Sequence, residues 1–205
     1  MIALIEYGSG NVAAIMNILK QKKIAHVLTS DPNEIANADR YILPGVGAFD
    51  PTMNHLVQSG IVDVLNEQVL GRKKKVLGIC VGMQLLANAS DEGSRQGLGW
   101  VPGRVRKIDT GSLTQPPRLP HMGWNDIDVQ PGASLFDKVD ADRGFYFLHS
   151  YYFDAAHSEH VAAKVTYGNT LTCAVEKENI FGVQFHPEKS HSNGAQLLQN
   201  FAELL

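Results

Sequence analysis

Hydrophobic and polar residues alternate in blocks along the first 90 residues of the chain. Short apolar runs that favour buried strands are separated by stretches in which apolar residues recur at helical spacing. The predicted strands are residues 2–5, 26–29, 41–43 and 76–79, and the predicted helices are residues 12–20, 33–38, 53–67 and 81–87. This alternation predicts an open, mostly parallel sheet with helices on both faces.

The pattern changes after residue 90. Two segments, 97–109 and 125–139, contain only short apolar runs interrupted by proline and glycine, which favours hairpins and loops over crossover helices. The remaining predicted elements are strands at 144–153, 161–165, 171–175 and 180–185 and a closing helix from 192 or 193 to 205. We therefore expect an antiparallel extension of the sheet in the C-terminal half, within a single domain that covers residues 1–205.

Composition and charge exclude several classes of protein. The 205 residues are 44% hydrophobic and carry a formal net charge of -3, without the basic patch that nucleic-acid binding requires. The N-terminus lacks the pattern of a signal peptide and no apolar stretch reaches membrane-spanning length, so we expect a cytoplasmic protein. Cys80 and Cys173 need not pair in such a protein, and Cys173, inside a predicted hairpin strand, is expected in the core.

Cys80 lies at the junction between a predicted strand and a predicted helix. Gly78 and Gly82 flank it at two residues on either side, which is a cysteine version of the Gly-x-Ser-x-Gly nucleophile elbow. At the N-terminus of a helix, a thiolate is favoured and the amide of Val81 points towards an oxyanion formed by attack of Cys80. The alternative, a cysteine that is only a small buried apolar residue, stays open at this point.

Glycine-rich loops follow two other predicted strands. The Gly8-Ser9-Gly10 loop resembles a dinucleotide-binding turn, but Ala13 occupies the place of its third glycine. The loop PGVG at 44–47 can turn its amides outward, which makes Val46 or Gly47 a candidate second oxyanion donor, with a plain turn as the alternative.

The last predicted strand ends in His186-Pro187-Glu188. Residues two apart in an extended chain face the same side, so a base and a carboxylate that orients it are expected to lie together. Cys80, His186 and Glu188 then supply a nucleophile, a general base and an orienting group.

With these motifs in place, the chain resembles the class I glutamine amidotransferases, which have a flavodoxin-like fold. Within that family it is similar to the glutaminase subunits of imidazole glycerol phosphate synthase. The motifs that carry the resemblance are YGSGN at 7–11, PGVGAF at 44–49, GICVGMQLL at 78–86, PHMGWN at 120–125, HSY at 149–151 and GVQFHPEKS at 182–190. Two departures are small: Val81 stands where we expect leucine, and Glu6 where we expect aspartate.

The resemblance implies a cofactor-independent reaction. Cys80 attacks the side-chain amide of glutamine to form a glutamyl thioester, and His186, held by Glu188, moves the protons. Oxyanion donors are Val81 and either Val46 or Gly47, the second being turned away until the partner is loaded. The residues that hold glutamine are Gln84, His149, Ser150 and Tyr151.

The resemblance also implies a partner. Ammonia passes into a (β/α)8-barrel cyclase subunit of a heterodimer, which forms imidazole glycerol phosphate and AICAR in histidine biosynthesis. The residues expected at the interface are Asn11, Met122, Trp124, Tyr146 and Lys189. Independently of the family, a Met-Gly-Trp sequence outside an apolar run is typical of a contact surface.

Four alternatives remain beside this interpretation. The same glutaminase chemistry serves a sugar-amidating synthetase in surface-polysaccharide biosynthesis, and the motifs do not separate the two partners. A redox or aldehyde-acting cysteine protein of similar architecture lacks the His-Pro-Glu strand end. A metal site at His186, Glu188 and His191, or at His157 and His160, lacks a complete ligand set. A catalytically inactive regulatory subunit conflicts with the intact triad.

Overall fold

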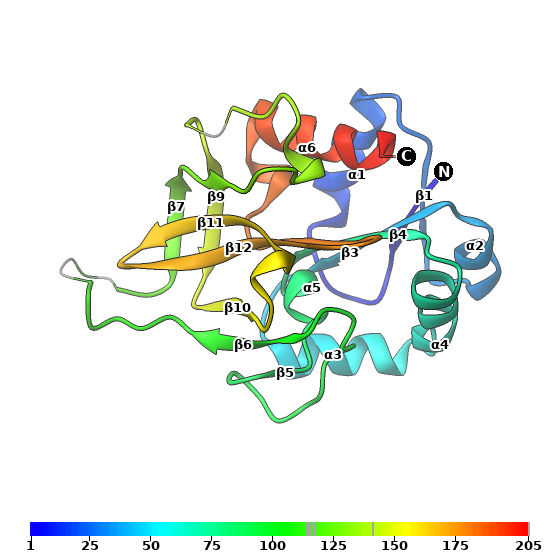
Figure 1. Cartoon of the computed structure of the whole chain (residues 1–205). Helices are drawn as coiled ribbons and strands as arrows, with labels where there is room; N and C mark the ends of the chain where they lie inside the picture. Colours follow the sequence, from blue (N-terminus) through cyan, green and yellow to red (C-terminus); the bar gives the residue numbers. More distant parts are fainter. Residues whose placement is uncertain (114–115, 117, 141, 205) are drawn as a thin grey trace.

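An eight-stranded sheet runs through the centre of the molecule (Figure 1). The computed structural model describes residues 1–113, 116, 118–140 and 142–204. From one edge to the other, the strands are β2 (His26–Thr29), β1 (Ile2–Ile5), β3 (Arg40–Gly45), β4 (Lys75–Cys80), β13 (Ile180–Val183), β12 (Asn169–Lys177), β11 (Val161–Tyr167) and β8 (Asp128–Val129). The first five are parallel and the last three antiparallel, which confirms the predicted fold class.

Helices cover both faces of this sheet (Figure 1). α1 and α6 pack together on one face, and α3 and α4 lie on the other. The helices are α1 (Val12–Gln21), α2 (Pro32–Asn37), α3 (Phe49–Gln58), α4 (Val62–Asn66), α5 (Val81–Gln84) and α6 (His191–Glu203). Within the described residues, none of these helices combines the length and the apolar character needed to cross a bilayer.

Two small sheets stand beside the C-terminal half of the large one. One has the order β10 (Tyr151–Ala155), β6 (Gly103–Lys107), β5 (Ala89–Ser90), and the other pairs β7 (His121–Asn125) with β9 (Phe145–His149). The segment 144–153, predicted as one strand, is thus two strands that join different sheets and change direction at Ser150.

Other predicted boundaries are wrong for local reasons. The helix expected at 53–67 is two helices, because Gly60 takes φ +74° between α3 and α4. β3 continues through Pro44, since β1 pairs only as far as Ile42 and leaves that side of Pro44 without a partner strand. The helix expected at 81–87 ends at Gln84 and the strand expected at 180–185 ends at Val183. The last residue of the predicted closing helix, 205, lies outside the described residues.

Cys173 is fully buried within β12, as predicted.

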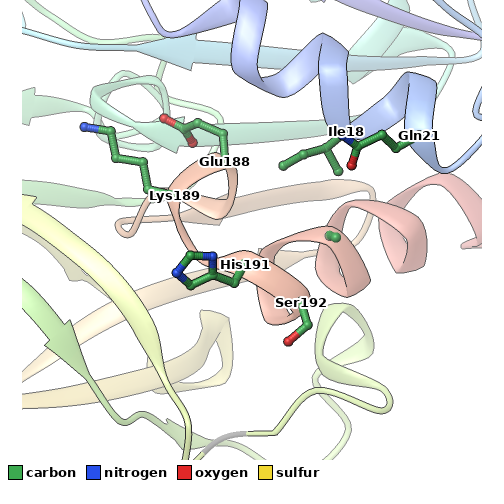
Figure 2. A pocket seen from close by; sticks show the side chains of 7 residues that line it. Ile18, Gln21, Glu188, Lys189, His191 and Ser192 are labelled. Carbon is green, nitrogen blue, oxygen red and sulfur yellow. The ribbon is translucent and has the colours of Figure 1, made fainter.

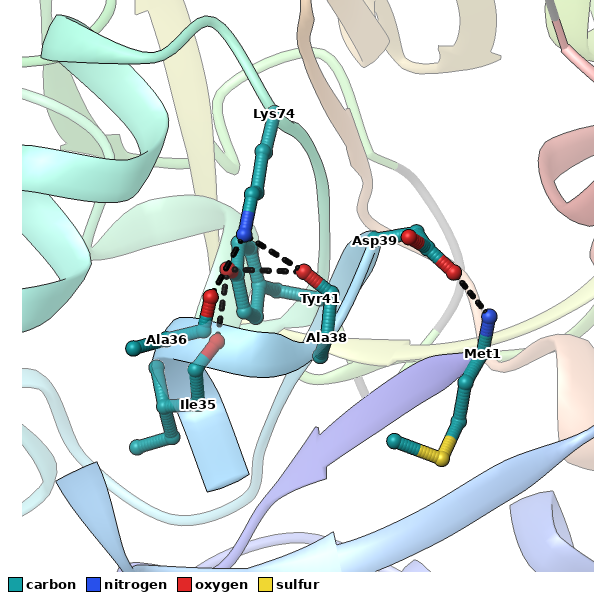
Figure 3. Close-up of polar contacts among 7 residues, drawn as sticks. All are labelled: Met1, Ile35, Ala36, Ala38, Asp39, Tyr41 and Lys74. Atoms are coloured by element: carbon teal, nitrogen blue, oxygen red, sulfur yellow. Dashed lines mark hydrogen bonds and ion pairs between the residues drawn. The ribbon is translucent and has the colours of Figure 1, made fainter. Parts of the chain in front are cut away.

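Contacts at the amino end of the sheet anchor the short helix α2 (Figure 3). The Lys74 ammonium donates to the carbonyls of Ala36 and Ala38 at 2.7 Å each, and the Tyr41 hydroxyl donates to the Ile35 carbonyl at 2.8 Å. Carbonyls at a helix end have no partner within the helix, and a cation also favours the helix dipole. The beginnings of β3 and β4 are therefore tied to the end of α2.

Three glycines let α5 lie directly on the backbone of the sheet, where β4 ends. A Cβ atom on Gly82 would stand 1.9 Å from the Leu43 carbonyl oxygen, and one on Gly45 would stand 2.4 Å from the Gly82 nitrogen. A Cβ on Gly78 would stand 2.6 Å from the Gly82 oxygen. Each of these neighbours is main chain and cannot move aside, so this contact fixes the position of Cys80.

We predict that Gly82→Ala destabilises the protein by about 3 kcal/mol or more, because overpacking at a fixed backbone cannot relax. Urea unfolding measures the change. The matched control is Gly71→Ala, whose added methyl meets no atom within 4 Å and whose effect we expect to stay within about 1 kcal/mol. Equal unfolding midpoints for the two variants would contradict this account of the elbow.

Candidate active site

Cys80 occupies a strained turn between β4 and α5. Its backbone has φ +55° and ψ −114°, a conformation that residues other than glycine rarely adopt. The residue is 5% exposed, and Gly45 of β3 lies opposite it in the parallel register. Val81 is the first residue of α5, so its N–H cannot bond within that helix. The geometry has the features predicted for a nucleophile elbow.

His186 and Glu188 meet as predicted, but through a different backbone geometry. The Nδ1 atom of His186 lies 2.9 Å from Oε1 of Glu188, and both side chains are almost completely buried. Residues Pro187–Lys189 form a 3-10 turn, so the expectation of an extended chain is wrong there. The turn is held by Ser190, whose hydroxyl donates to the His186 carbonyl at 2.6 Å.

The surroundings of His186 favour its protonated form. Burial alone disfavours a charged ring, but the neighbouring Cys80 side chain and the Glu188 carboxylate outweigh it and raise the pKa of His186 to about 10. At neutral pH the ring is therefore a cation beside Cys80 and can give a proton to a leaving group.

Two glutamine side chains connect Cys80 to β10. Gln184 is fully buried and donates from Nε2 towards the Cys80 sulfur at 3.7 Å. Gln84 donates to the Gln184 side-chain oxygen at 3.0 Å and to the Tyr151 carbonyl at 3.2 Å. The amide of Gln84 is thus fixed at the wall of the site.

A small pocket of about 140 Å³ opens beside Cys80. A pocket of this size suits a small ligand. The lining residues that the sequence predicted are Gly47, Cys80, Val81, Gln84, His149, Ser150 and Tyr151. Glu92 and Pro120 also line it. The Glu92 carboxylate gives the pocket an acceptor for a positively charged group.

The PGVG loop is held by Ser9 from the loop after β1. The Val46 N–H donates to the Ser9 hydroxyl oxygen at 2.9 Å, and that hydroxyl donates to the Val46 carbonyl at 3.0 Å. The buried Tyr7 hydroxyl donates to the Pro44 carbonyl. The Val46 amide is thus engaged outside the pocket, while Gly47 lies at the pocket wall with φ +99°.

Most of the residues expected at a partner interface form one surface patch. Met122 and Trp124 are 61% and 45% exposed on β7. The Trp124 ring packs edge-on against Tyr146, and the Lys189 ammonium lies 5.5 Å from the centre of the Tyr146 ring. Asn11 is exposed at the start of α1, which packs against the Pro187–Lys189 turn.

A hollow of about 410 Å³ lies between α1 and the beginning of α6 (Figure 2). Its lining includes Glu188, Lys189 and His191. The His191 ring stacks on Trp124 at 5.2 Å, so it belongs to the surface patch.

His157 and His160 lie in or beside a separate turn before β11, with their rings 5.4 Å apart. Among the described residues, no three His, Cys, Asp or Glu side chains are grouped as metal ligands.

Sequence reasoning assigned no role to several residues of this site: Ser9, Glu92, Pro120, His121 and Gln184. Ser9, Pro120, His121 and Gln184 stand inside the motifs at 7–11, 120–125 and 182–190, and Gln184 is two residues from His186. Glu92 lies in a polar loop whose contact with the pocket depends on long-range packing. Only the tertiary structure brings these side chains together.

Comparisons with known proteins agree with this geometry. The family profile described as "Glutamine amidotransferase class-I" matches residues 3–204. The chain is 47% identical over 204 residues to "Imidazole glycerol phosphate synthase subunit HisH" of Bdellovibrio bacteriovorus, covering 100% of each chain. It is 44% identical over 204 residues to the protein of the same name from Leptospira borgpetersenii, again covering 100% of each.

A solved structure, "Crystal structure of glutamine amidotransferase", matches with a TM-score of 0.74 and 17% identity, covering 99% of this chain and 98% of that one. At this identity the match shows the fold alone.

We predict that Glu188→Gln lowers the pKa of His186 from about 10, because burial continues to oppose the charged ring after the carboxylate charge is lost. NMR titration of the histidine side chains measures it. The folded-state pKa lies above the ordinary 6.5, so the stabilisation is complete below pH 6.5 and is lost as pH rises through 10.

Glu188→Gln should therefore cost more unfolding free energy at pH 6 than at pH 10. Glu34→Gln on the exposed face of α2 is the control and should show no such difference. An unshifted His186 titration in Glu188→Gln would contradict the assigned cause.

Proposed function

The chain belongs to the class I glutamine amidotransferases, and within them to the HisH subunits of imidazole glycerol phosphate synthase, and we propose that it hydrolyses glutamine to supply ammonia to a synthase partner. In this proposal residues 1–205 form one amidotransferase domain. The observation that carries it is the strained Cys80 beside the buried His186–Glu188 pair, at the wall of a pocket for a small ligand.

The first half of the reaction transfers an acyl group to Cys80. The sulfur attacks the side-chain amide carbon of glutamine and a C–S bond forms. His186 gives its proton to the amide nitrogen, the C–N bond breaks and ammonia leaves. Glu188 keeps the imidazolium in place through its contact with Nδ1. A protonated His186 at neutral pH suits this step.

The second half releases glutamate. Water attacks the thioester carbon and gives a proton to neutral His186, and the C–S bond breaks to return the Cys80 thiolate. The balance needs only water, so the reaction uses no cofactor. The Val81 N–H, free of its own helix, supports the oxyanion in both halves.

The pocket wall has suitable groups for glutamine itself. Gln84, His149 and the Ser150–Tyr151 segment enclose the substrate on one side. We assign Glu92 to the α-ammonium group, because a carboxylate at the pocket wall pairs with a cation there.

In this proposal the second oxyanion donor, the N–H of Val46 or of Gly47, does not act until the partner is loaded. The Val46 N–H, which would complement that of Val81, donates to the Ser9 hydroxyl oxygen. The Val46 carbonyl accepts a hydrogen bond from the same hydroxyl. We propose that binding of the loaded partner releases this pair and turns the N–H of Val46 or of Gly47 towards the pocket. Glutamine is then hydrolysed only when ammonia can be used.

For the partner we propose the (β/α)8-barrel cyclase of histidine biosynthesis, in keeping with the name of the relatives. The surface patch of Met122, Trp124, Tyr146 and Lys189 is the docking face in this proposal. Ammonia passes from the pocket into the barrel, where imidazole glycerol phosphate is formed.

The first test is glutamate release from glutamine by the purified chain, alone and with the histidine-pathway cyclase plus its nucleotide ligand. We expect stimulation by the loaded cyclase and complete loss in Cys80→Ala. Glu92→Gln should raise the KM for glutamine about tenfold or more, with a smaller effect on kcat, because it removes a charge-assisted contact.

Hydrolysis that depends on Cys80 but ignores the cyclase would keep the glutaminase and reject this partner. No hydrolysis under any condition would reject the glutaminase.

A second test concerns the Ser9–Val46 pair. We predict that Ser9→Ala raises partner-independent glutaminase activity up to about tenfold, the equivalent of one hydrogen bond that holds the amide away. Ser59→Ala, which removes a hydroxyl at the end of α3, is the control and should leave the basal rate unchanged. A lower rate with the loaded cyclase and no gain in basal rate would show that Ser9 supports the active form instead.

A further inference from the structure

A buried chain of hydrogen bonds runs from β7 to the pocket. The Asn125 side-chain nitrogen lies 3.4 Å from Nε2 of His121, and Nδ1 of His121 lies 2.9 Å from Nε2 of His149. Nδ1 of His149 lies 2.8 Å from the Tyr151 carbonyl oxygen. Both histidines are almost fully buried, at 3% and 6% exposure. The reaction steps above use neither ring as an acid or a base.

The last acceptor in this series of hydrogen bonds determines which atom donates at every step. The Tyr151 carbonyl can only accept, so Nδ1 of His149 carries the hydrogen and, in a neutral ring, Nε2 accepts. His121 must then donate from Nδ1 and accept at Nε2, where it meets the donating amide of Asn125. That amide also donates to the Thr166 carbonyl at 3.0 Å. The chain is self-consistent only with both rings neutral.

The packing around His121 favours the neutral ring. Its face stacks on Tyr167 at 4.1 Å and on Phe147 at 4.8 Å. Burial lowers the pKa of His121 to about 4, and burial also lowers the pKa of His149 to about 3. His121 is therefore held in one plane and one tautomer by its neighbours.

This series of hydrogen bonds ends at the Tyr151 carbonyl oxygen, which is also connected to Cys80. The Tyr151 carbonyl also accepts from Gln84, which donates to Gln184, which in turn donates towards the Cys80 sulfur. A displacement of His149 or of the Ser150–Tyr151 segment therefore shifts the hydrogen-bond acceptor of Gln84 and the pocket wall.

We propose that His121 is a positioning residue for glutamine binding: as a neutral donor from Nδ1, it orients His149 and so fixes the Ser150–Tyr151 wall of the pocket. It does not touch the substrate. This role rests on the proposed glutaminase function, and it gives the PHMGWN motif a second purpose besides its exposed Met122 and Trp124.

The test compares His121→Asn with His121→Leu in steady-state glutaminase kinetics, each with the loaded cyclase. Asparagine can place an amide N–H where Nδ1 stood, whereas leucine is closer to histidine in volume and cannot donate. We expect His121→Leu to raise the KM for glutamine about tenfold with a smaller change in kcat, and His121→Asn to stay within about threefold of wild type, as for loss and retention of one buried hydrogen bond.

A purely structural role predicts the opposite order, because leucine preserves the packing between Tyr167 and Phe147 and asparagine leaves a gap. Unfolding midpoints measured beside the kinetics report that contribution separately. A KM at least as high in His121→Asn as in His121→Leu, or kinetics unchanged in both, would overturn the proposal.

A second readout does not depend on activity. In the ¹⁵N spectrum of histidine-labelled wild-type protein, we expect both His121 and His149 as neutral rings protonated at Nδ1. Protonation of either ring at Nε2 would overturn the proposal. A wild-type protein without glutaminase activity would instead reject the proposed function, and with it the kinetic role, while this spectrum still shows whether the chain of hydrogen bonds exists.

Discussion

The site depends on a contact between main chains at the end of β4. Gly82 touches the Leu43 carbonyl and the backbone of Gly45 approaches Gly82, so α5 has no side-chain layer between itself and the sheet. This close approach accompanies the positive φ of Cys80, whose backbone lies at the end of β4 between β3 and β13. The neighbouring groups reach Cys80 only because β4, the turn and α5 pack together at glycines, where a Cβ atom would not fit.

Three buried histidines around this elbow show how neighbours decide charge. All three lose solvation on burial, which favours the neutral ring. His186 has a carboxylate and Cys80 beside it and becomes a cation, whereas His121 and His149 face aromatic rings, amides and a carbonyl and stay neutral. One residue type is thus held as a cation beside Cys80 and as neutral hydrogen-bonded rings on β7 and β9.

The sequence predicted that His186 and Glu188 lie together, but it predicted an extended backbone for this segment. His186 and Glu188 meet because a 3-10 turn folds them together, not because a strand continues through Pro187. The family resemblance implied that Gln84 belongs to the site, and its side chain lines the pocket. Ser9, Glu92 and His121 could not be predicted, because each meets a partner at least 28 residues away in the chain: Val46, Phe49 and His149 respectively. No local spacing encodes such contacts.

By itself, the sequence determined the parallel strands of the first half, the elbow at Cys80 and the family, because hydrophobic periodicity and local motifs act over a few residues. The tertiary structure alone decided where strands end, how β9 and β10 separate, and which polar side chains meet at the pocket. These outcomes depend on sheet neighbours and long-range packing, such as the absence of a β1 partner at Pro44 and the convergence of Gln84 and His149 on one carbonyl.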